Sequence, residues 1–211
     1  MKIEVTSISA MNSGAEIVIE VRISEGENFE KRKLILLARQ YAELRISKGE
    51  IERDSFEELV EAGEVCAAVK RGMNILGYGA CSEKNMALKL RSKGFDKEIS
   101  AQAAKYLSAI GYINEGEDAV REAERCLKKY WGIKRIVAFL YEKGYSESAV
   151  RLAVAELDGY DMSEACIALV ERKLGGLPDD REAQKKLFAS LLRYGHSSSD
   201  IKKAFDFLSK K

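Results

Sequence analysis

Apolar residues recur with two different periods along this chain, and the change from one period to the other falls near residue 65. Before that point apolar and polar residues alternate, as in Ile17, Ile19, Val21 and Ile23 with their polar neighbours. A period of two is typical of strands buried on one face. Beyond that point apolar residues recur every three or four positions, as in amphipathic helices. The pattern predicts a mainly α protein preceded by a small β-rich N-terminal region.

The β-rich region is predicted to hold strands over KIEVTSI and AEIVIEVRI, with a third over FEKRKLIL. The Asn12-Ser13-Gly14 segment suits a turn with positive φ between the first two strands. The segments LLARQYAEL and DSFEELVEAGEV have helical spacing and are expected to cover the sheet, with Asp54 or Ser55 capping the second. One face of the first strand is expected to hold Ile3, Val5 and Ser7.

A short corner sequence recurs three times, at intervals of 50 and 51 residues. Glycine stands at positions 94, 144 and 195, with Leu four residues before it and a side chain suited to packing directly after it, then Asp or Ser. This order is typical of a helix that ends in a left-handed Gly, followed by a new helix capped by Asp or Ser. Recurrence at such a period indicates tandem modules.

Each corner joins two helices and leaves room in its period for one more. We therefore expect three tandem three-helix repeats that form an elongated, curved array. The predicted boundaries are residues 1–64 for the N-terminal region with its covering helices, and 65–110, 111–158 and 159–211 for the repeats.

The residue types argue against catalytic and cofactor chemistry. The chain has a single His, no C-x-x-C pair among its four cysteines and no G-x-x-x-x-G-K-[ST] loop. A metal cluster or catalytic dyad needs partners for that His, and none is identifiable. We expect no enzyme activity, no metal and no cofactor, with buried structural cysteines and His196 packed at the third corner.

The net charge of +1 conceals an uneven distribution. Residues 1–64 hold 9 Lys and Arg against 14 Asp and Glu, a net charge of −5, and residues 65–211 hold 26 against 20, a net charge of +6. Such asymmetry indicates two surfaces with different partners. No signal peptide and no apolar window of about 20 residues is present, so we expect a cytoplasmic protein without membrane contact.

The stretch CLKKYWGIKR interleaves basic and aromatic side chains. Such groups suit contact with phosphate or with an acidic protein groove. The alternative is that Trp131 packs at a helix junction while the charges are solvated. Arg91 and Lys93 end another helix, where positive charge also favours the helix dipole. The candidate partner-binding residues are Arg91, Lys93, Lys128, Lys129, Trp131, Lys134 and Arg135.

Three segments in order resemble the RecX family of regulators of the RecA recombinase. They are SEKNMALKLRSKGF, LSAIGYINEGEDAVREA and WGIKRIVAFLYEKGYSESAV. The matching positions are Ser82, Leu90, Lys93, Gly94, Phe95, Gly111, Tyr112, Ile113, Asn114, Gly132, Arg135, Ile136, Leu140, Lys143 and Gly144. The chain departs from the family at Gly79-Ala80-Cys81, where a basic pair is expected, and at Asn85-Met86 and Glu115-Gly116-Glu117. The resemblance covers residues 65–211 well and 1–64 loosely.

The resemblance implies a non-enzymatic modulator that lies in the groove of the RecA–DNA filament, and we expect a monomer. It would act as an inhibitor in DNA repair, limiting filament growth, ATPase and strand exchange, with at most weak, non-specific DNA contact. Two alternatives remain from the residues alone. One is a helix-turn-helix-like DNA-binding protein, because three-helix units with tight turns resemble such modules. The other is a helical-repeat scaffold for a different protein.

Overall fold

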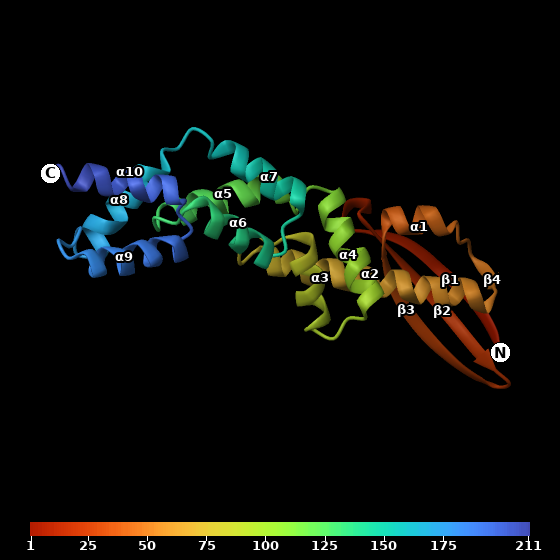
Figure 1. Cartoon of the computed structure of the whole chain (residues 1–211). Coiled ribbons are helices and arrows are strands. Elements are labelled where there is room, and N and C mark those ends of the chain that lie inside the picture. The colour runs from red at the N-terminus through yellow and green to blue at the C-terminus, as the bar shows by residue number, and fades with distance from the viewer. The chain divides into compact units, whose positions relative to one another are not determined.

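The computed structural model describes residues 1–211, apart from the side chain of Lys173. The chain forms two compact units (Figure 1). Unit 1 comprises Met1–Gly79 and Met86–Ile113, and unit 2 comprises Ala80–Asn85 and Asn114–Lys211. Unit 1 therefore contains the β-rich region and most of the first repeat, and unit 2 contains the second and third repeats.

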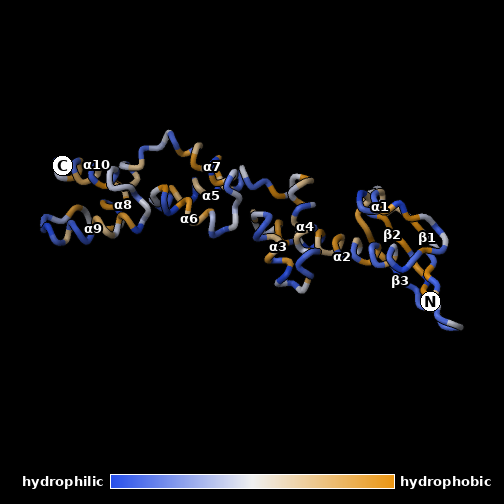
Figure 2. The backbone as a smooth tube through the Cα atoms, turned by 45° about the vertical axis from the view of Figure 1, so that its right-hand side comes forward, coloured by the Kyte–Doolittle hydropathy of each residue, from blue (hydrophilic) through white to orange (hydrophobic). Residues whose placement is uncertain are grey.

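Unit 1 begins with an antiparallel sheet in the order β3-β2-β1-β4. Figure 2 shows hydrophobic stretches along β1 and β2, in keeping with the alternation that predicted them. The pattern missed β4, because three residues are too few to display a period. The elements are β1 (Lys2–Met11), the short 3-10 turn η1 (Asn12–Gly14), β2 (Glu16–Glu25), β3 (Asn28–Leu37) and β4 (Gly49–Ile51).

A bulge in β1 corrects one expected face. The register against β2 shifts between Val5 and Ser7, so one extra residue reverses the alternation beyond that point. Ile8, rather than Ser7, then packs with Ile3 and Val5 in the core of the sheet. The assignment of Ser7 to that face is wrong for this reason.

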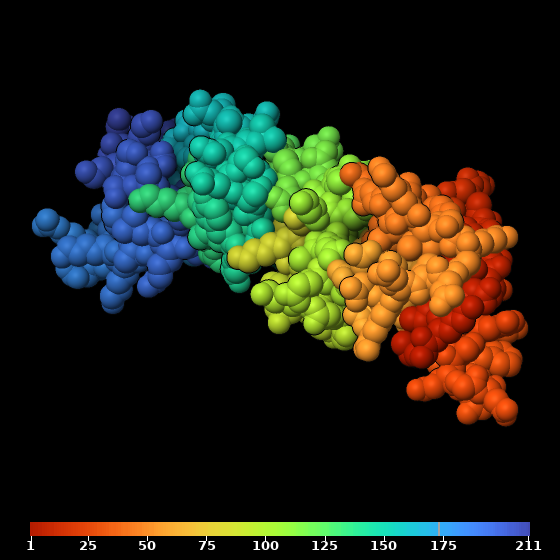
Figure 3. Space-filling model, turned by 90° about the vertical axis from the view of Figure 1, so that its right-hand side faces the viewer, coloured from red at the N-terminus to blue at the C-terminus, as the bar shows by residue number. Residues whose placement is uncertain are grey.

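Helices α1 (Ala38–Leu44) and α2 (Arg53–Leu76) pack beside the sheet. Leu59 and Ala62 of α2 join the apolar side chains of the strands in one buried cluster. Figure 3 shows the orange side chains of this part of the chain against the red strands. The helical covering predicted for the sheet is confirmed.

The start and the length of α2 differ from expectation. The helix begins at Arg53 with Glu52 as its N-cap and no side-chain cap, so neither Asp54 nor Ser55 holds the capping position. The predicted helix DSFEELVEAGEV does not end near residue 65 but continues to Leu76 in α2. Gly63 lies within that segment, and one glycine does not stop a helix that is packed on a sheet. The C-terminal half of α2 is thus the first helix of the first repeat.

The remaining helices follow the predicted order of three per repeat, which confirms the mainly α fold. The second repeat packs around Ile136 and Leu140, and the third around Leu191 and Ile201, each with its own buried cluster. The helices are α3 (Glu83–Arg91), α4 (Lys97–Ala109), α5 (Glu115–Leu127), α6 (Ile133–Glu142), α7 (Glu147–Glu156), α8 (Met162–Lys173), α9 (Arg181–Arg193) and α10 (Ser198–Leu208).

The three glycine corners have the predicted geometry. Gly94, Gly144 and Gly195 have φ of 95°, 80° and 93°. At each corner the N–H of the following residue donates to the carbonyl of a buried Leu five residues earlier, which closes the helix end. Asp96, Ser146 and Ser197 then cap the next helix by accepting from a backbone N–H.

The four cysteines are buried, as expected for small apolar core residues. Among the described residues no group of His, Cys, Asp and Glu side chains is arranged to hold a metal ion. No helix in the described part of the chain has the length and apolar character needed to cross a membrane.

Candidate protein-interaction site

The corners at Gly144 and Gly195 each contact the residue at the start of a helix, and both contacts lie within unit 2. The Ser82 hydroxyl donates to the carbonyl of Lys143, 2.8 Å away, and also caps α3 by accepting from the Asn85 N–H at 3.2 Å. At the other corner the Gly132 N–H, which immediately precedes α6, donates to the carbonyl of Tyr194 at 2.9 Å. Both contacts join a helix start to the carbonyl just before a corner glycine.

The contact between Gly132 and Gly195 leaves no space for a side chain. A Cβ on Gly132 would lie 2.3 Å from the carbonyl carbon and oxygen of Gly195, and a Cβ on Gly195 would lie 2.4 Å from the backbone nitrogen of Arg135. These distances are far shorter than van der Waals contact. The close approach fixes the third-repeat corner against the start of α6.

Trp131 and Arg135 add side-chain contacts at this joint, where the corner at Gly195 meets the start of α6. The guanidinium carbon of Arg135 lies 4.0 Å from the centre of the Trp131 ring and 5.2 Å from that of Tyr194. Trp131 also forms an edge-to-face pair with Phe139, with ring centres 5.5 Å apart. Trp131 is half-buried against the core of the second repeat, so the structure places it at a helix junction.

The basic residues of the candidate set divide between the two units. Lys128, Lys129 and Lys134 are exposed and flank Trp131 in unit 2, and the Lys129 ammonium lies 5.4 Å from the centre of the Trp131 ring. Arg91 and Lys93 are exposed at the C-terminal end of α3 in unit 1. The structure therefore brings five of the seven candidate residues together around one joint.

The role of Tyr130, next to this cluster, could not be predicted from the sequence. Tyr130 has a φ of 61°, unusual for a residue with a side chain, and its hydroxyl accepts from Arg172 at 3.0 Å. Because that partner lies 42 residues further along the chain, no local pattern predicts the pair. The two side chains line an open hollow of about 660 Å³, together with Glu124, Leu127, Lys128, Tyr160, Asp161, Glu164, Ala165 and Ala168.

His196 is fully buried beside the same segment, which confirms its predicted packing role. Its Nε2 lies 3.0 Å from the carbonyl oxygen of Tyr130. Burial lowers the pKa of His196, while the Tyr130 carbonyl and Asp200 act in the opposite direction. The neutral imidazole ring of His196 thus connects the third corner to the segment just before α6.

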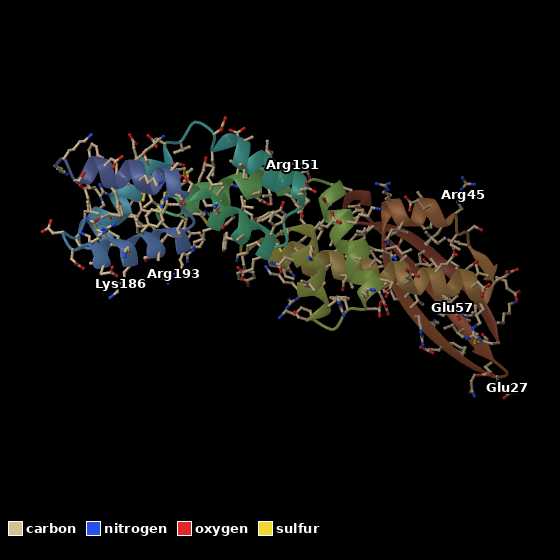
Figure 4. All side chains as sticks on the ribbon, in the orientation of Figure 1. Glu27, Arg45, Glu57, Arg151, Lys186 and Arg193 are labelled. Carbon is tan, nitrogen blue, oxygen red and sulfur yellow. The ribbon has the colours of Figure 1, made fainter. Side chains whose placement is uncertain are left out.

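Further basic side chains extend along α9 in unit 2. Figure 4 shows Lys186 and Arg193 pointing away from α8 and α10. Arg193 directly precedes Tyr194, the residue on which Arg135 stacks. The joint therefore combines half-buried aromatic rings with exposed cationic groups from two repeats, and this combination is able to attract phosphates or carboxylates.

Comparison with known proteins finds sequence similarity to members of the same family. Residues 160–205 match the family model of the third three-helix domain of RecX. The chain is 27% identical over 135 residues to the regulatory protein RecX of Chlorobaculum tepidum, covering 64% of this chain and 82% of that protein. It is 28% identical over 147 residues to the regulatory protein RecX of Amycolatopsis mediterranei, covering 66% and 78%.

Solved structures show that the fold is also shared. A crystal structure of a regulatory protein RecX superposes with a TM-score of 0.73 and 19% identity, covering 97% of this chain and 99% of that one. The crystal structure of RecX from Lactobacillus salivarius gives a TM-score of 0.62 and 22% identity, covering 71% and 99%. The resemblance to the RecX family indicated by the sequence is confirmed.

Proposed function

We propose, from the premise that this is a RecX-type chain in sequence and in fold, that the protein binds the RecA filament on DNA and restrains it. The observation that carries the proposal is the match of residues 160–205 to the third RecX domain, supported by relatives that are named regulatory proteins. Restraint would take the form of reduced filament growth, ATPase and strand exchange.

The surface proposed for this contact is the joint around Trp131. Lys128, Lys129 and Lys134 provide exposed positive charge there, and Arg91 and Lys93 add positive charge in unit 1. Clustered cations attract an acidic protein groove or the phosphates beneath it. Arg135 and Trp131 hold the backbone that carries these lysines, so their contribution to binding is mainly positioning.

The mechanism proposed is steric and electrostatic, not chemical. Each repeat offers its own contact surface, and a filament offers the same subunit many times. Because the repeats are covalently linked, binding of one repeat raises the effective concentration of the next at the filament. Several weak contacts therefore give a higher overall affinity than any one of them. A protein bound in this way occupies filament surface that subunit addition and strand exchange need. We propose that it acts as a monomer and without catalysis.

Binding to preformed RecA filaments on single-stranded DNA tests the surface. We expect the triple variant K128E/K129E/K134E to weaken filament binding by about tenfold or more, since interfacial charge reversals cost several kcal/mol. The variant K202E/K203E/K210E reverses the same number of exposed charges on and after α10 and serves as the matched control. Equal weakening by both variants would leave only a net-charge effect and would contradict the assignment of this surface.

The same assay with DNA alone separates the proposal from direct DNA recognition. A helix-turn-helix-like protein would bind duplex DNA without RecA and with a steep dependence on salt. We expect binding of that kind to be weak and independent of sequence. Tight binding to duplex alone would favour the DNA-binding alternative.

A further inference from the structure

The first glycine corner is constructed like the other two, yet no described residue covers it. A Cβ on Gly144 would meet the Ser82 hydroxyl at 3.0 Å, and one on Gly195 would meet the Arg135 nitrogen at 2.4 Å. A Cβ on Gly94 would meet nothing within 4 Å among the described residues. The corner at Gly94 is therefore open where its two counterparts are occupied.

The occupied corners show what kind of group fits there. In both, the carbonyl of the residue before the glycine accepts a hydrogen bond from a helix start, from the Ser82 hydroxyl in one case and the Gly132 N–H in the other. This contact sets the negative C-terminal end of one helix against the positive N-terminal end of another. Lys93 holds the equivalent place at the first corner, and its carbonyl receives no such bond from a described residue.

The open corner also presents apolar surface. It forms a hollow of about 660 Å³ lined by Leu88, Arg91, Gly94, Phe95, Asp96 and Lys97. Leu88 is 53% exposed, whereas alanines occupy the corresponding positions of α6 and α9. Phe95 is partly exposed, in contrast to the buried Tyr145 and His196 at the occupied corners. Leu88 and Phe95 therefore leave apolar side chains uncovered at this corner, next to the charged groups that line the same hollow.

The charges next to Gly94 favour some incoming helix starts over others. Arg91 and Lys97 line the hollow and Lys93 directly precedes Gly94, which places three positive charges next to this corner. Of the two carboxylates in the same segment, Asp96 is engaged in capping α4 and Glu98 lies in the first turn of that helix. An incoming helix with Asp or Glu in its first turn would be attracted to this surface, and such acids are common at helix starts. The charge of the corner thus complements an acidic first turn.

The third repeat of a second copy of the chain does not supply the matching helix start. Helices α3 and α6 begin 11 residues before their corner glycines, whereas α9 begins 14 residues before Gly195. The first turn of α9 is displaced by nearly one helical turn relative to its counterparts, so it does not present the surface that the occupied corners receive.

We propose that the Gly94 corner docks the acidic first turn of a helix belonging to a partner protein. The naming of RecA as that partner rests on the proposed function. The corner would then receive from the partner the contact that its counterparts receive from within the chain.

The test combines charge reversal with mapping of the contact on RecA filaments. The variant K93E/K97E changes two exposed residues, one at a helix end and one at a helix start, so their opposite effects on helix stability offset each other. We expect it to weaken filament binding by about tenfold. The variant K31E/K105E reverses two other exposed charges of unit 1 and should change binding less than about twofold.

A photoreactive benzoylphenylalanine at position 88 identifies what lies in the hollow. We expect cross-links to the first turn of a RecA helix that carries Asp or Glu. Cross-links to DNA, or to a RecA segment that is not a helix start, would overturn the inference. So would full affinity of K93E/K97E. If the unmodified protein does not bind the filament, the proposed function fails, and with it the choice of RecA as the partner. If the protein binds and the substitutions at the Gly94 corner do not change its affinity, only this inference is overturned.

Discussion

Arg135 stacks its guanidinium group on the ring of Trp131, with 4.0 Å between the guanidinium carbon and the ring centre. The same guanidinium carbon lies 5.2 Å from the centre of the ring of Tyr194, the C-cap residue of α9. One cation is thus shared by an aromatic ring before α6 and another from the third repeat. Trp131 and Arg135, which the sequence indicates as partner-binding residues, therefore also hold the second and third repeats together.

Removing Trp131 should therefore cost stability as well as binding. We expect Trp131→Ala to lower the free energy of unfolding by about 2–3 kcal/mol, because it deletes a half-buried ring together with its contacts to Phe139 and Arg135. Urea unfolding followed by circular dichroism measures the change. Lys134→Ala, at an exposed neighbour, should change stability by less than about 0.5 kcal/mol and provides the comparison.

The Gly132–Gly195 contact yields a sharper prediction. Gly132→Ala should destabilise the protein by about 3 kcal/mol, since the new methyl group would lie 2.3 Å from backbone atoms of Gly195 and His196, so the backbone would have to shift. Gly132 has a φ of −79°, so the cost is steric and not conformational. Gly159→Ala is the matched control, because no heavy atom lies within 4 Å of its Cβ position. Similar midpoints in urea for the two variants would contradict the close approach.

Much of this architecture follows from local sequence. The corners at Gly94, Gly144 and Gly195 repeat one conformational requirement, a left-handed residue followed by a helix cap, and this requirement acts over a few neighbouring residues. The strands β1 to β3 are long enough for alternation to be recognised. Local information therefore predicted the fold class and the three helices of each repeat.

What the sequence missed depends on contacts between distant segments. The bulge at Val5/Ser7 is set by pairing with β2, and the stacking of Arg135 on Tyr194 joins residues almost sixty positions apart. The sequence did contain one indication of the corner contacts, because small residues stand at equivalent repeat positions, Ser82 and Gly132, fifty positions apart. A repeat position restricted to small residues indicates a close backbone approach, but the sequence does not identify the approaching segment.

His196 predicts a dependence of stability on pH. Burial lowers the pKa of His196 in the folded state below the unfolded value of about 6.5, so the unfolded chain binds more protons in the interval between the two. The free energy of unfolding should fall as the pH decreases below about 6.5 and should be unaffected by this group at higher pH. Urea unfolding at about pH 7 and about pH 5.5 measures the slope.

The variant His196→Phe places at the third corner the side chain found at the first. It should lose the part of the slope that arises from this ring. An unchanged slope in the variant would show that other groups govern the pH dependence.

The cysteines predict slow chemistry in the folded protein. All four are buried, and burial raises the pKa of the Cys166 thiol to about 12, so its reactive thiolate is scarce at neutral pH. A disulfide reagent such as Ellman's should react with four thiols in urea and hardly at all without it. Rapid stoichiometric reaction of the native protein would contradict the burial of these side chains.

RecA-dependent ATP hydrolysis on single-stranded DNA, measured with this protein added well below the concentration of RecA, tests the proposed function most directly. Because a protein that restrains a filament acts on many subunits at once, we predict a marked fall in the hydrolysis rate together with shorter filaments in electron micrographs. An unchanged rate and an unchanged distribution of filament lengths, at protein concentrations up to that of RecA itself, would contradict the account.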